Sequence, residues 1–213
     1  MSATGPRRDA GFTMVEMLVA MALFAALGTV LLGFVLGSSR VATDVTAAGN
    51  ITEEARLATE RMSRELRQAE QISGATVTGG RVVSLTLGVD FDGSGFVETD
   101  DALDPEVLTY RWDATDRTLT LTANNAVTRP VLAGGVQAVD IRLRSSSWIH
   151  DADGDGTTTW QEIDEAAVGN ANGLPDGAEL ALVDLVSVKL EVRDGDAVRS
   201  FTVQADLRNR GAT

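Results

Sequence analysis

The hydrophobic pattern opens with one long apolar run. From Phe12 to Leu36 the only charged residue is Glu16, and about 25 residues of helix can cross a bilayer core of about 30 Å. A cleavable secretory signal would carry a shorter apolar stretch, and a buried core helix would not stay apolar on every face for so many turns. The run therefore predicts a transmembrane helix over residues 12–36.

The helical pattern continues beyond this run as an apolar stripe. Apolar or small residues recur at spacings of four and three, which places them on one helix face: Val41, Val45, Ala48, Thr52, Ala55, Thr59, Met62, Leu66 and Ala69. Charged residues occupy the other faces, and Ser73-Gly74 supplies a stop signal. We expect one helix from Phe12 to about Gln71, with residues 37–73 forming its amphipathic continuation.

After Gly74 the pattern changes to short runs that alternate apolar and polar residues. The alternation predicts six strands, which are Val82–Leu87, Val107–Trp112, Thr118–Thr122, Val136–Leu143, Val186–Val192 and Phe201–Leu207. The last two flank Asp194-Gly195, which is typical of a hairpin turn. We expect an α+β fold in which residues 74–213 form an antiparallel sheet with one face against the helix.

Composition and charge exclude several classes of function. The net charge is −13, and it becomes −14 without residues 1–11, which hold Arg7, Arg8 and Asp9. So acidic a chain repels phosphate backbones, and we expect no nucleic-acid partner. The chain has no cysteine and a single histidine, His150, which excludes a zinc–cysteine site, a thiol nucleophile and a histidine-rich metal cluster.

The start of the apolar run carries a processing signal. Gly11, the aromatic Phe12, and Glu16 five positions into the run resemble the prepilin motif of the type IV pilin-like family. The resemblance implies that prepilin peptidase removes residues 1–11 and methylates the new amine of Phe12. It also implies that Glu16 pairs with the N-terminal amine of a neighbouring subunit, inside a helix bundle whose low dielectric strengthens the pair.

The order of one long helix followed by hairpins is similar to J-type minor pseudopilins of type II secretion and to related minor pilins of type IV pili. This resemblance implies a non-enzymatic subunit that helps initiate or cap a pseudopilus, with sibling minor and major pseudopilins and an inner-membrane assembly platform as partners. Arg7 and Arg8 precede the span, which favours a cytoplasmic N-terminus and a periplasmic C-terminal domain. The alternatives are a minor pilin for adhesion, motility or DNA uptake, and a membrane-anchored calcium-binding domain that never polymerises.

One acidic segment matches a metal-binding pattern. Residues 151–162 fit D-x-D-x-D-G-x5-E, the EF-hand calcium loop, in which alternate acidic residues converge on one ion and the final Glu binds it bidentately. The predicted ligands are Asp151, Asp153, Asp155, the backbone carbonyl of Thr157, and Glu162. Because no disulfide can hold the exported domain together, we expect a structural role for calcium.

A second segment repeats this spacing in weaker form. Its predicted ligands are Asp90, Asp92, Ser94, Phe96 and Asp101. Ser94 replaces a carboxylate, and Asp101 is shorter than the Glu that closes a typical loop. A third polar loop contains Asn170, Asn172 and Asp176, and we interpret it as a turn.

Overall fold

The computed structural model describes residues 13–100, 103, 105–124, 127–132, 134–194 and 197–207, and only the backbone of residues 36–50 and 194. The chain divides into two compact units, Met1–Ala47 and Ala48–Thr213. Helix α1 (Met14–Gln68) begins in the first unit and ends in the second.

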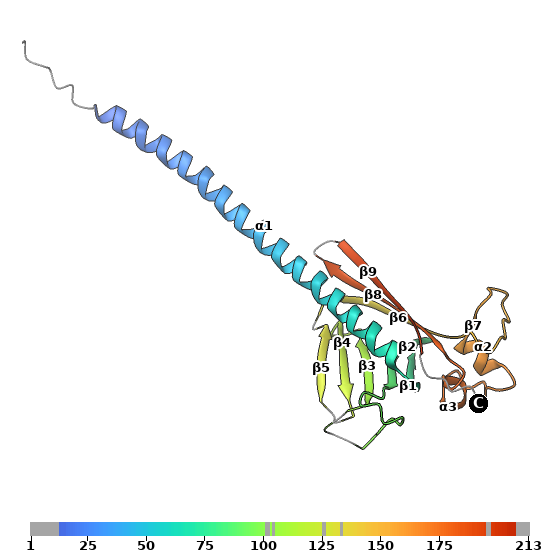
Figure 1. The fold of residues 1–213 in the computed structure, drawn as a ribbon. Coiled ribbons are helices and arrows are strands. Elements are labelled where there is room, and N and C mark those ends of the chain that lie inside the picture. Colours follow the sequence, from blue (N-terminus) through green and yellow to red (C-terminus); the bar gives the residue numbers. More distant parts are fainter. Residues whose placement is uncertain are drawn as a thin grey trace, which may run out of the picture. The chain divides into compact units, whose positions relative to one another are not determined.

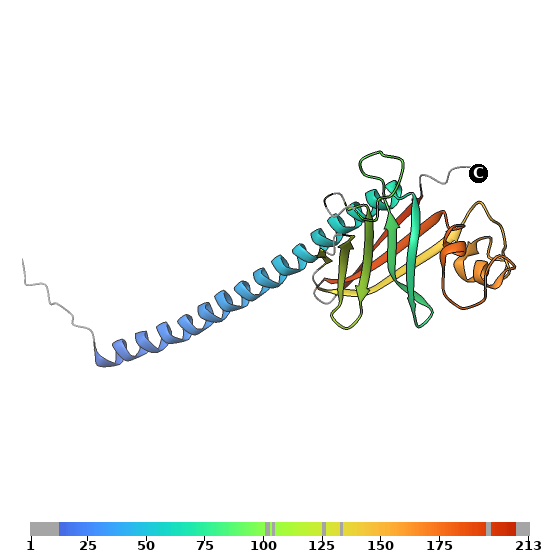
Figure 2. The ribbon, with the colours of Figure 1, turned by 90° about the horizontal axis from the view of Figure 1, so that it is seen from below.

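The second unit is built on one curled sheet, in which every described strand pairing is antiparallel (Figures 1 and 2). Its strands are β1 (Gln71–Thr78), β2 (Arg81–Gly88), β3 (Val107–Asp113), β4 (Thr118–Ala123), β5 (Thr128–Leu132), β6 (Val136–Ser145), β7 (Thr158–Thr159), β8 (Leu185–Asp194) and β9 (Ala197–Asp206). Their order is β5-β4-β3-β2-β6-β8-β9, with β1 paired to β2 and β7 paired to β6. Two short helices, α2 (Trp160–Glu165) and α3 (Gly177–Leu180), lie between β7 and β8 in the chain.

The C-terminal part of α1 packs on this sheet through small and apolar side chains. Ala55, Ala58, Met62, Leu66 and Ala69 are buried in one cluster with residues from the strands. The predicted stripe is therefore confirmed over this part of the helix, with one difference. The stripe contained Thr59, which is only half-buried, whereas the neighbouring Ala58 is buried. The side chains of Val41, Val45 and Ala48 lie outside the described residues.

The predicted α+β fold is confirmed, and all six predicted strands are present. The hairpin of β8 and β9 is the most regular pair, with ten residues of each strand in continuous register. Val186, Val188 and Leu190 of β8 lie opposite Ala205, Val203 and Phe201 of β9, on the face that contributes to the core. Alternation of apolar and polar residues predicted this register because a shift of one residue would turn the apolar set to solvent.

The predicted end of the helix is wrong by one turn. Helix α1 ends at Gln68, and Ser73-Gly74 lies inside β1 instead of stopping the helix. The backbone of Glu70 already donates to the carbonyl of Gly88 at 2.9 Å, so pairing with β2 takes over where the helical bonds end. The register of β1 shifts between Ile72 and Gly74, and this irregularity hides the strand from a search for strict alternation.

Strands β5 and β7 were also missed. Strand β5 contains Pro130, which is tolerated because β5 pairs with β4 alone and lies at the end of the strand order. Strand β7 has only two residues, Thr158 and Thr159, which pair with Ser145 and Arg144 of β6. This short pairing closes the base of the acidic segment between β6 and α2, and so holds the predicted calcium loop.

Candidate functional site

The N-terminal part of α1 is apolar on all sides. Met14–Val35 is a 22-residue stretch long and apolar enough to cross a membrane, and none of it is buried in the first unit. Phe24 and Phe34 are 81% and 75% exposed, which is unfavourable in water and favourable in lipid. Gly11 and Phe12, the predicted cleavage and methylation residues, lie outside the described residues.

Glu16, the predicted assembly residue, lies in the first turn of this helix and bonds to Thr13. Its carboxylate accepts hydrogen bonds at 3.0 Å from both the backbone N–H and the hydroxyl of Thr13. The Thr13 hydroxyl in turn accepts the N–H of Glu16 at 3.2 Å, which completes a reciprocal cap. The capped carboxylate is thus held at the end of the helix, close in sequence to the amine that cleavage before Phe12 would create.

The predicted calcium loop between β6 and α2 brings its three aspartates together. Carboxylate oxygens of Asp151, Asp153 and Asp155 lie within 4.8 Å of one another, and all three side chains are exposed. Asp151 accepts N–H groups from Gly154, Asp155 and Gly156 at 2.7–3.0 Å, so the backbone wraps around this one side chain. The hydroxyl and the N–H of Thr157 bond to Asp155 and lower its pKa, which keeps this carboxylate ionised.

Glu162, the predicted closing ligand, is a buried residue of α2 outside this triad. Its carboxylate accepts the N–H of Ala152 at 2.8 Å and the N–H of Thr159 at 2.8 Å. Burial raises its pKa, but these donors outweigh burial and lower the pKa overall. The ionised carboxylate therefore reaches from the helix back to the start of the loop, where a closing ligand must lie.

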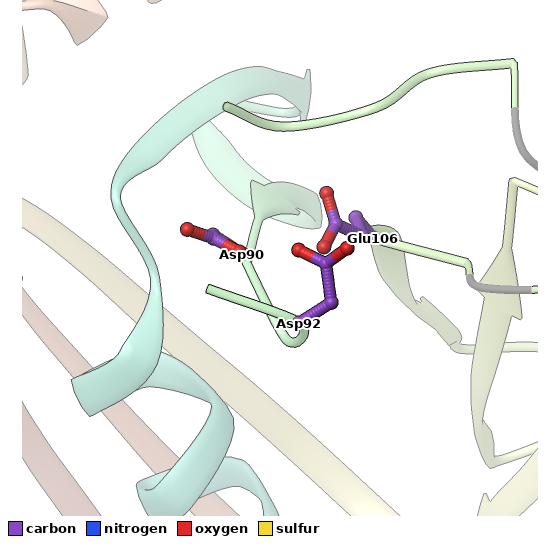
Figure 3. Close-up of side chains that lie close together, drawn as sticks. All are labelled: Asp90, Asp92 and Glu106. Atoms are coloured by element: carbon purple, nitrogen blue, oxygen red, sulfur yellow. The ribbon is translucent and has the colours of Figure 1, made fainter. Parts of the chain in front are cut away.

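The second acidic loop, between β2 and β3, has the same frame with a different closing residue. Asp90 accepts the N–H groups of Gly93, Ser94 and Gly95 at 2.6–3.1 Å. The bond from Gly95 is the largest of several that lower the pKa of Asp90. Carboxylate oxygens of Asp90, Asp92 and Glu106 lie within 4.8 Å of one another, and Figure 3 shows the three side chains close together.

The sequence pattern did not identify Glu106, because this residue lies after the last position of the pattern, just before β3. It is 1% exposed, and its two oxygens accept the N–H groups of Phe91 and Glu98 at 2.9 and 2.8 Å. Phe91 and Glu98 are the second and ninth positions of this loop, as Ala152 and Thr159 are of the first. Glu106 thus bonds to this loop as Glu162 bonds to the first, whereas Asp101, the predicted closing ligand, lies outside the described residues.

The other predicted ligands of the second loop occupy loop positions consistent with the pattern. The hydroxyl of Ser94 donates a hydrogen bond to the carbonyl of Phe96 at 3.0 Å. The two oxygens predicted as metal ligands therefore lie side by side. Ser94 also donates to Glu98, whose pKa is raised chiefly by its contact with the carboxylate of Glu106. Two carboxylates in contact repel each other, and this repulsion raises the pKa of one of them. A divalent cation between them would offset the repulsion.

The third polar loop is more than the turn that was predicted. Asp164 of α2, which is buried, accepts the N–H groups of Asn172 and Gly173 at 3.1 and 2.8 Å. Glu179 of α3, also buried, accepts the N–H groups of Asn170 and Asp176 at 3.3 and 3.1 Å. Burial raises the pKa of Glu179, and the charges of Asp176 and Asp164 raise it further.

The three loops share one hydrogen-bonded frame. In each, one Asp accepts the N–H of the glycine at the sharp bend: Asp151 from Gly156, Asp90 from Gly95, and Asp164 from Gly173. In each, one Glu accepts the N–H of the residue three positions after that glycine: Glu162 from Thr159, Glu106 from Glu98, and Glu179 from Asp176. The bend glycines Gly156, Gly95 and Gly173 have φ of 83°, 86° and 73°, which side chains rarely adopt. In the first two loops the Asp precedes the bend glycine by five residues, whereas Asp164 precedes Gly173 by nine. The linear pattern therefore does not reveal Asp164.

Comparison with known proteins identifies the N-terminal segment. Residues 6–32 match the family model of the prokaryotic N-terminal methylation motif. Comparison with the curated proteins and with the solved structures gives no match. The motif lies across the predicted cleavage site, Glu16 and the membrane-length part of α1, and the second unit is an α+β domain built on the same helix. The chain is a type IV pilin-like protein.

Proposed function

We propose that the chain is a minor pseudopilin, a structural subunit that helps initiate or cap the pseudopilus of a type II secretion system. The observation that carries the proposal is the methylation motif at residues 6–32, with Glu16 as the one carboxylate of an otherwise uncharged span. A motif of this kind implies processing by prepilin peptidase and assembly with other pilins. The pilus alternative, a minor pilin for adhesion, motility or DNA uptake, shares this machinery.

The membrane arrangement follows from the charges around the span. Arg7 and Arg8 precede the apolar stretch, so the N-terminus lies in the cytoplasm and the second unit lies in the periplasm. The span stores the subunit in the inner membrane until an assembly platform, powered by an ATPase, extracts it. Once residues 1–11 are removed, the free amine of Phe12 is the cation that Glu16 of a neighbouring subunit lacks.

Glu16 then acts as a device for register. In the single chain its carboxylate is satisfied by the N–H and hydroxyl of Thr13. In the assembled bundle it exchanges these neutral donors for the charged amine of the next subunit, a stronger interaction at low dielectric. A charge pair of this kind specifies one axial position between helices whose other contacts are uniformly apolar.

We also propose that calcium stabilises the periplasmic domain. The proposal is supported by two sets of converging carboxylates, Asp151, Asp153 and Asp155 in the first loop and Asp90, Asp92 and Glu106 in the second. The chain has no cysteine, so ions would take the place of disulfides in bracing these loops. The third loop has the same frame, with Asn170 and Asn172 in place of two carboxylates, and would bind calcium more weakly.

The proposed role is structural and not enzymatic. The acidic clusters follow the spacing of cation loops. The single His150 is exposed, and its ring lies 5.4 Å from that of Trp148, tilted by 34°. Secretion, in this proposal, depends on how the subunit assembles and not on chemistry carried out by its domain.

The decisive experiment is mass spectrometry of the mature chain in its native host. A polypeptide that begins at N-methylated Phe12 supports the proposal, and one that begins upstream of Phe12 overturns it. A Gly11→Asp variant should accumulate as a precursor and lose function. An uncleaved variant with full function would favour the non-polymerising calcium-binding domain. Deletion of the gene separates the two assembled alternatives, because loss of protein secretion supports a pseudopilin and loss of surface fibres supports a pilin.

A further inference from the structure

The sheet ends in a strand whose outer edge is free. Strand β9 pairs with β8 along all ten residues and is last in the strand order. A free edge presents unpaired N–H and C=O groups and can pair with another chain. Because most proteins protect such edges, the protection of each outer strand in this sheet is informative.

The other outer strands are protected and β9 is not. Strand β5 is five residues long, contains Pro130 and has a shifted register against β4, and β1 has two register shifts against β2. Strand β9 contains neither proline nor lysine, and its register has no shift. Its only charged residues are Arg199 and Asp206, at opposite ends of a strand in a chain of net charge −13.

The backbone groups that face outward can be assigned. In an antiparallel pair, successive residues point alternately toward and away from the partner strand. Arg193 of β8 donates to Gly135 on its other side at 2.8 Å, and Leu207, just after β9, donates toward Asp184 at 2.9 Å. Odd-numbered residues of β9 therefore bond to β8, and the outward set is Val198, Ser200, Thr202, Gln204 and Asp206. None of these five has a hydrogen bond to another described residue outside the β8 pairing.

A groove runs along the same edge between β9 and α1. It has a volume of about 370 Å³ and is lined from β9 by Phe201, Thr202, Val203 and Gln204 and from α1 by Arg56, Thr59, Glu60, Ser63 and Arg67. Arg56 is paired with Glu60 at 3.1 Å, whereas Arg67 has no ion pair among the described residues. A strand added to β9 would place alternate side chains in this groove, and an acidic one would meet Arg67.

We infer that the free edge of β9 is an assembly surface that accepts a β-strand from a neighbouring pilin-like subunit, with an acidic side chain turned toward Arg67. Only an extended segment can satisfy a row of backbone donors and acceptors spaced along a strand. The uncharged Ser200, Thr202 and Gln204 admit such a segment without repulsion. The inference rests on the proposed function, because a subunit built into a fibre has a sibling domain beside its own.

The experiment places a photo-activatable phenylalanine analogue at Gln204 of the full-length chain in its native host, with Thr115, in the turn between β3 and β4, as the control position. A covalent adduct is expected from position 204 only. Its cross-linked peptide should come from a predicted strand with acidic residues, in a protein that carries the same N-terminal motif. An adduct with another class of protein, or none, overturns the inference.

Backbone pairing is tested by two matched changes at one position. Thr202→Pro removes an outward N–H that β8 does not use, and it should reduce the adduct about tenfold or more. Thr202→Val keeps the N–H and should leave the yield unchanged. Arg67→Glu, which leaves the residues of β9 unchanged, should reduce the yield several-fold. This variant keeps the inference testable if the proline variant fails to fold. An adduct that persists at full yield in both Thr202→Pro and Arg67→Glu contradicts strand addition.

The N-terminus of the mature chain is measured in the same samples. Processed Phe12 without the adduct overturns the β9 surface and leaves the filament proposal intact. An unprocessed chain overturns the filament proposal itself.

Discussion

The hydroxyl of Tyr110, in β3, donates a hydrogen bond to the carboxylate of Glu65, in α1. Tyr110 is 1% exposed and Glu65 is 8% exposed, so the bond lies in the interface between the helix and the sheet. Glu65 also accepts a bond from Arg61 at 2.7 Å, one turn earlier on the helix. Burial raises the pKa of Tyr110, and the nearby Glu65 charge raises it further, so the phenol remains a donor at every physiological pH. This polar contact sets the position of α1 along the sheet among otherwise apolar neighbours.

Replacing Tyr110 with Phe should destabilise the second unit by about 1.5–3 kcal/mol, because the charged Glu65 would lose a buried donor. Urea unfolding of the fragment that begins at Ala48 measures the change. The double variant Tyr110→Phe with Glu65→Leu should recover part of the loss, since no unpaired charge is then buried. Equal stability of Tyr110→Phe and the parent chain would show that the contact contributes nothing.

Calcium should raise the melting temperature of the same fragment, and a chelator should reverse the effect. With calcium at 100 times the dissociation constant, the gain is about 2.7 kcal/mol for each site. Asp153→Ala should remove the share due to the first loop, because it deletes one of three converging carboxylates. Glu165→Gln, which neutralises an exposed neighbour outside the ligand set, serves as the control. An identical melting curve with calcium and with chelator would count against structural ions.

Glu106→Gln should weaken binding at the second loop and spare the first. A missing closing carboxylate should weaken the site by at least about tenfold, the scale seen even for residues that only support ligands. Isothermal titration calorimetry would then report one ion fewer per chain. Asp116→Asn, in an exposed turn, should leave the stoichiometry unchanged. If the Glu106 variant keeps the full count, Asp101 remains the better candidate for the closing ligand.

Glu179 makes the third loop sensitive to pH. Burial raises its pKa above the ordinary 4.5, so the folded state holds this proton more tightly than the unfolded state does. Its contribution to stability is complete below pH 4.5 and is lost as the pH rises through the elevated value. In chelator, the stability of the parent chain relative to Glu179→Gln should therefore fall as the pH rises above 4.5. Calcium bound at this loop should remove that fall, and a fall that persists would argue that no ion binds there.

Glu16→Gln should separate processing from assembly. The amide keeps the size of the side chain but cannot pair with the charged amine of a neighbouring Phe12. Cleavage after Gly11 should continue, because the peptide bond that is cut is unchanged, whereas incorporation into fibres should fall sharply. Quantitative blotting of sheared fibres and membranes measures both in one culture. Assembly at the parent level would refute the role given to Glu16.

Local pattern accounts for the parts of this fold in which neighbouring residues carry the signal. The stripe through Ala55, Met62 and Leu66 predicted the buried helix face, and alternation in β8 and β9 predicted their hairpin. Strand β1 was missed because its register shifts at Gly74 break the alternation. The helix pattern places Glu65 with the charged residues on the other faces, and nothing in the helix sequence indicates that Tyr110, 45 residues later, reaches it.

The apolar helix, the processing motif and the first acidic loop could be predicted from the chain alone, because each depends on residues close together in it. The residues that complete the other two loops became visible only in the folded domain. Glu106 reaches Asp90 and Asp92 because the loop folds back over the entry to β3, and Asp164 reaches Gly173 because α2 places it beside a loop that begins later. Cation ligands must converge in space, and chain reversal brings together side chains that no fixed spacing in the sequence connects.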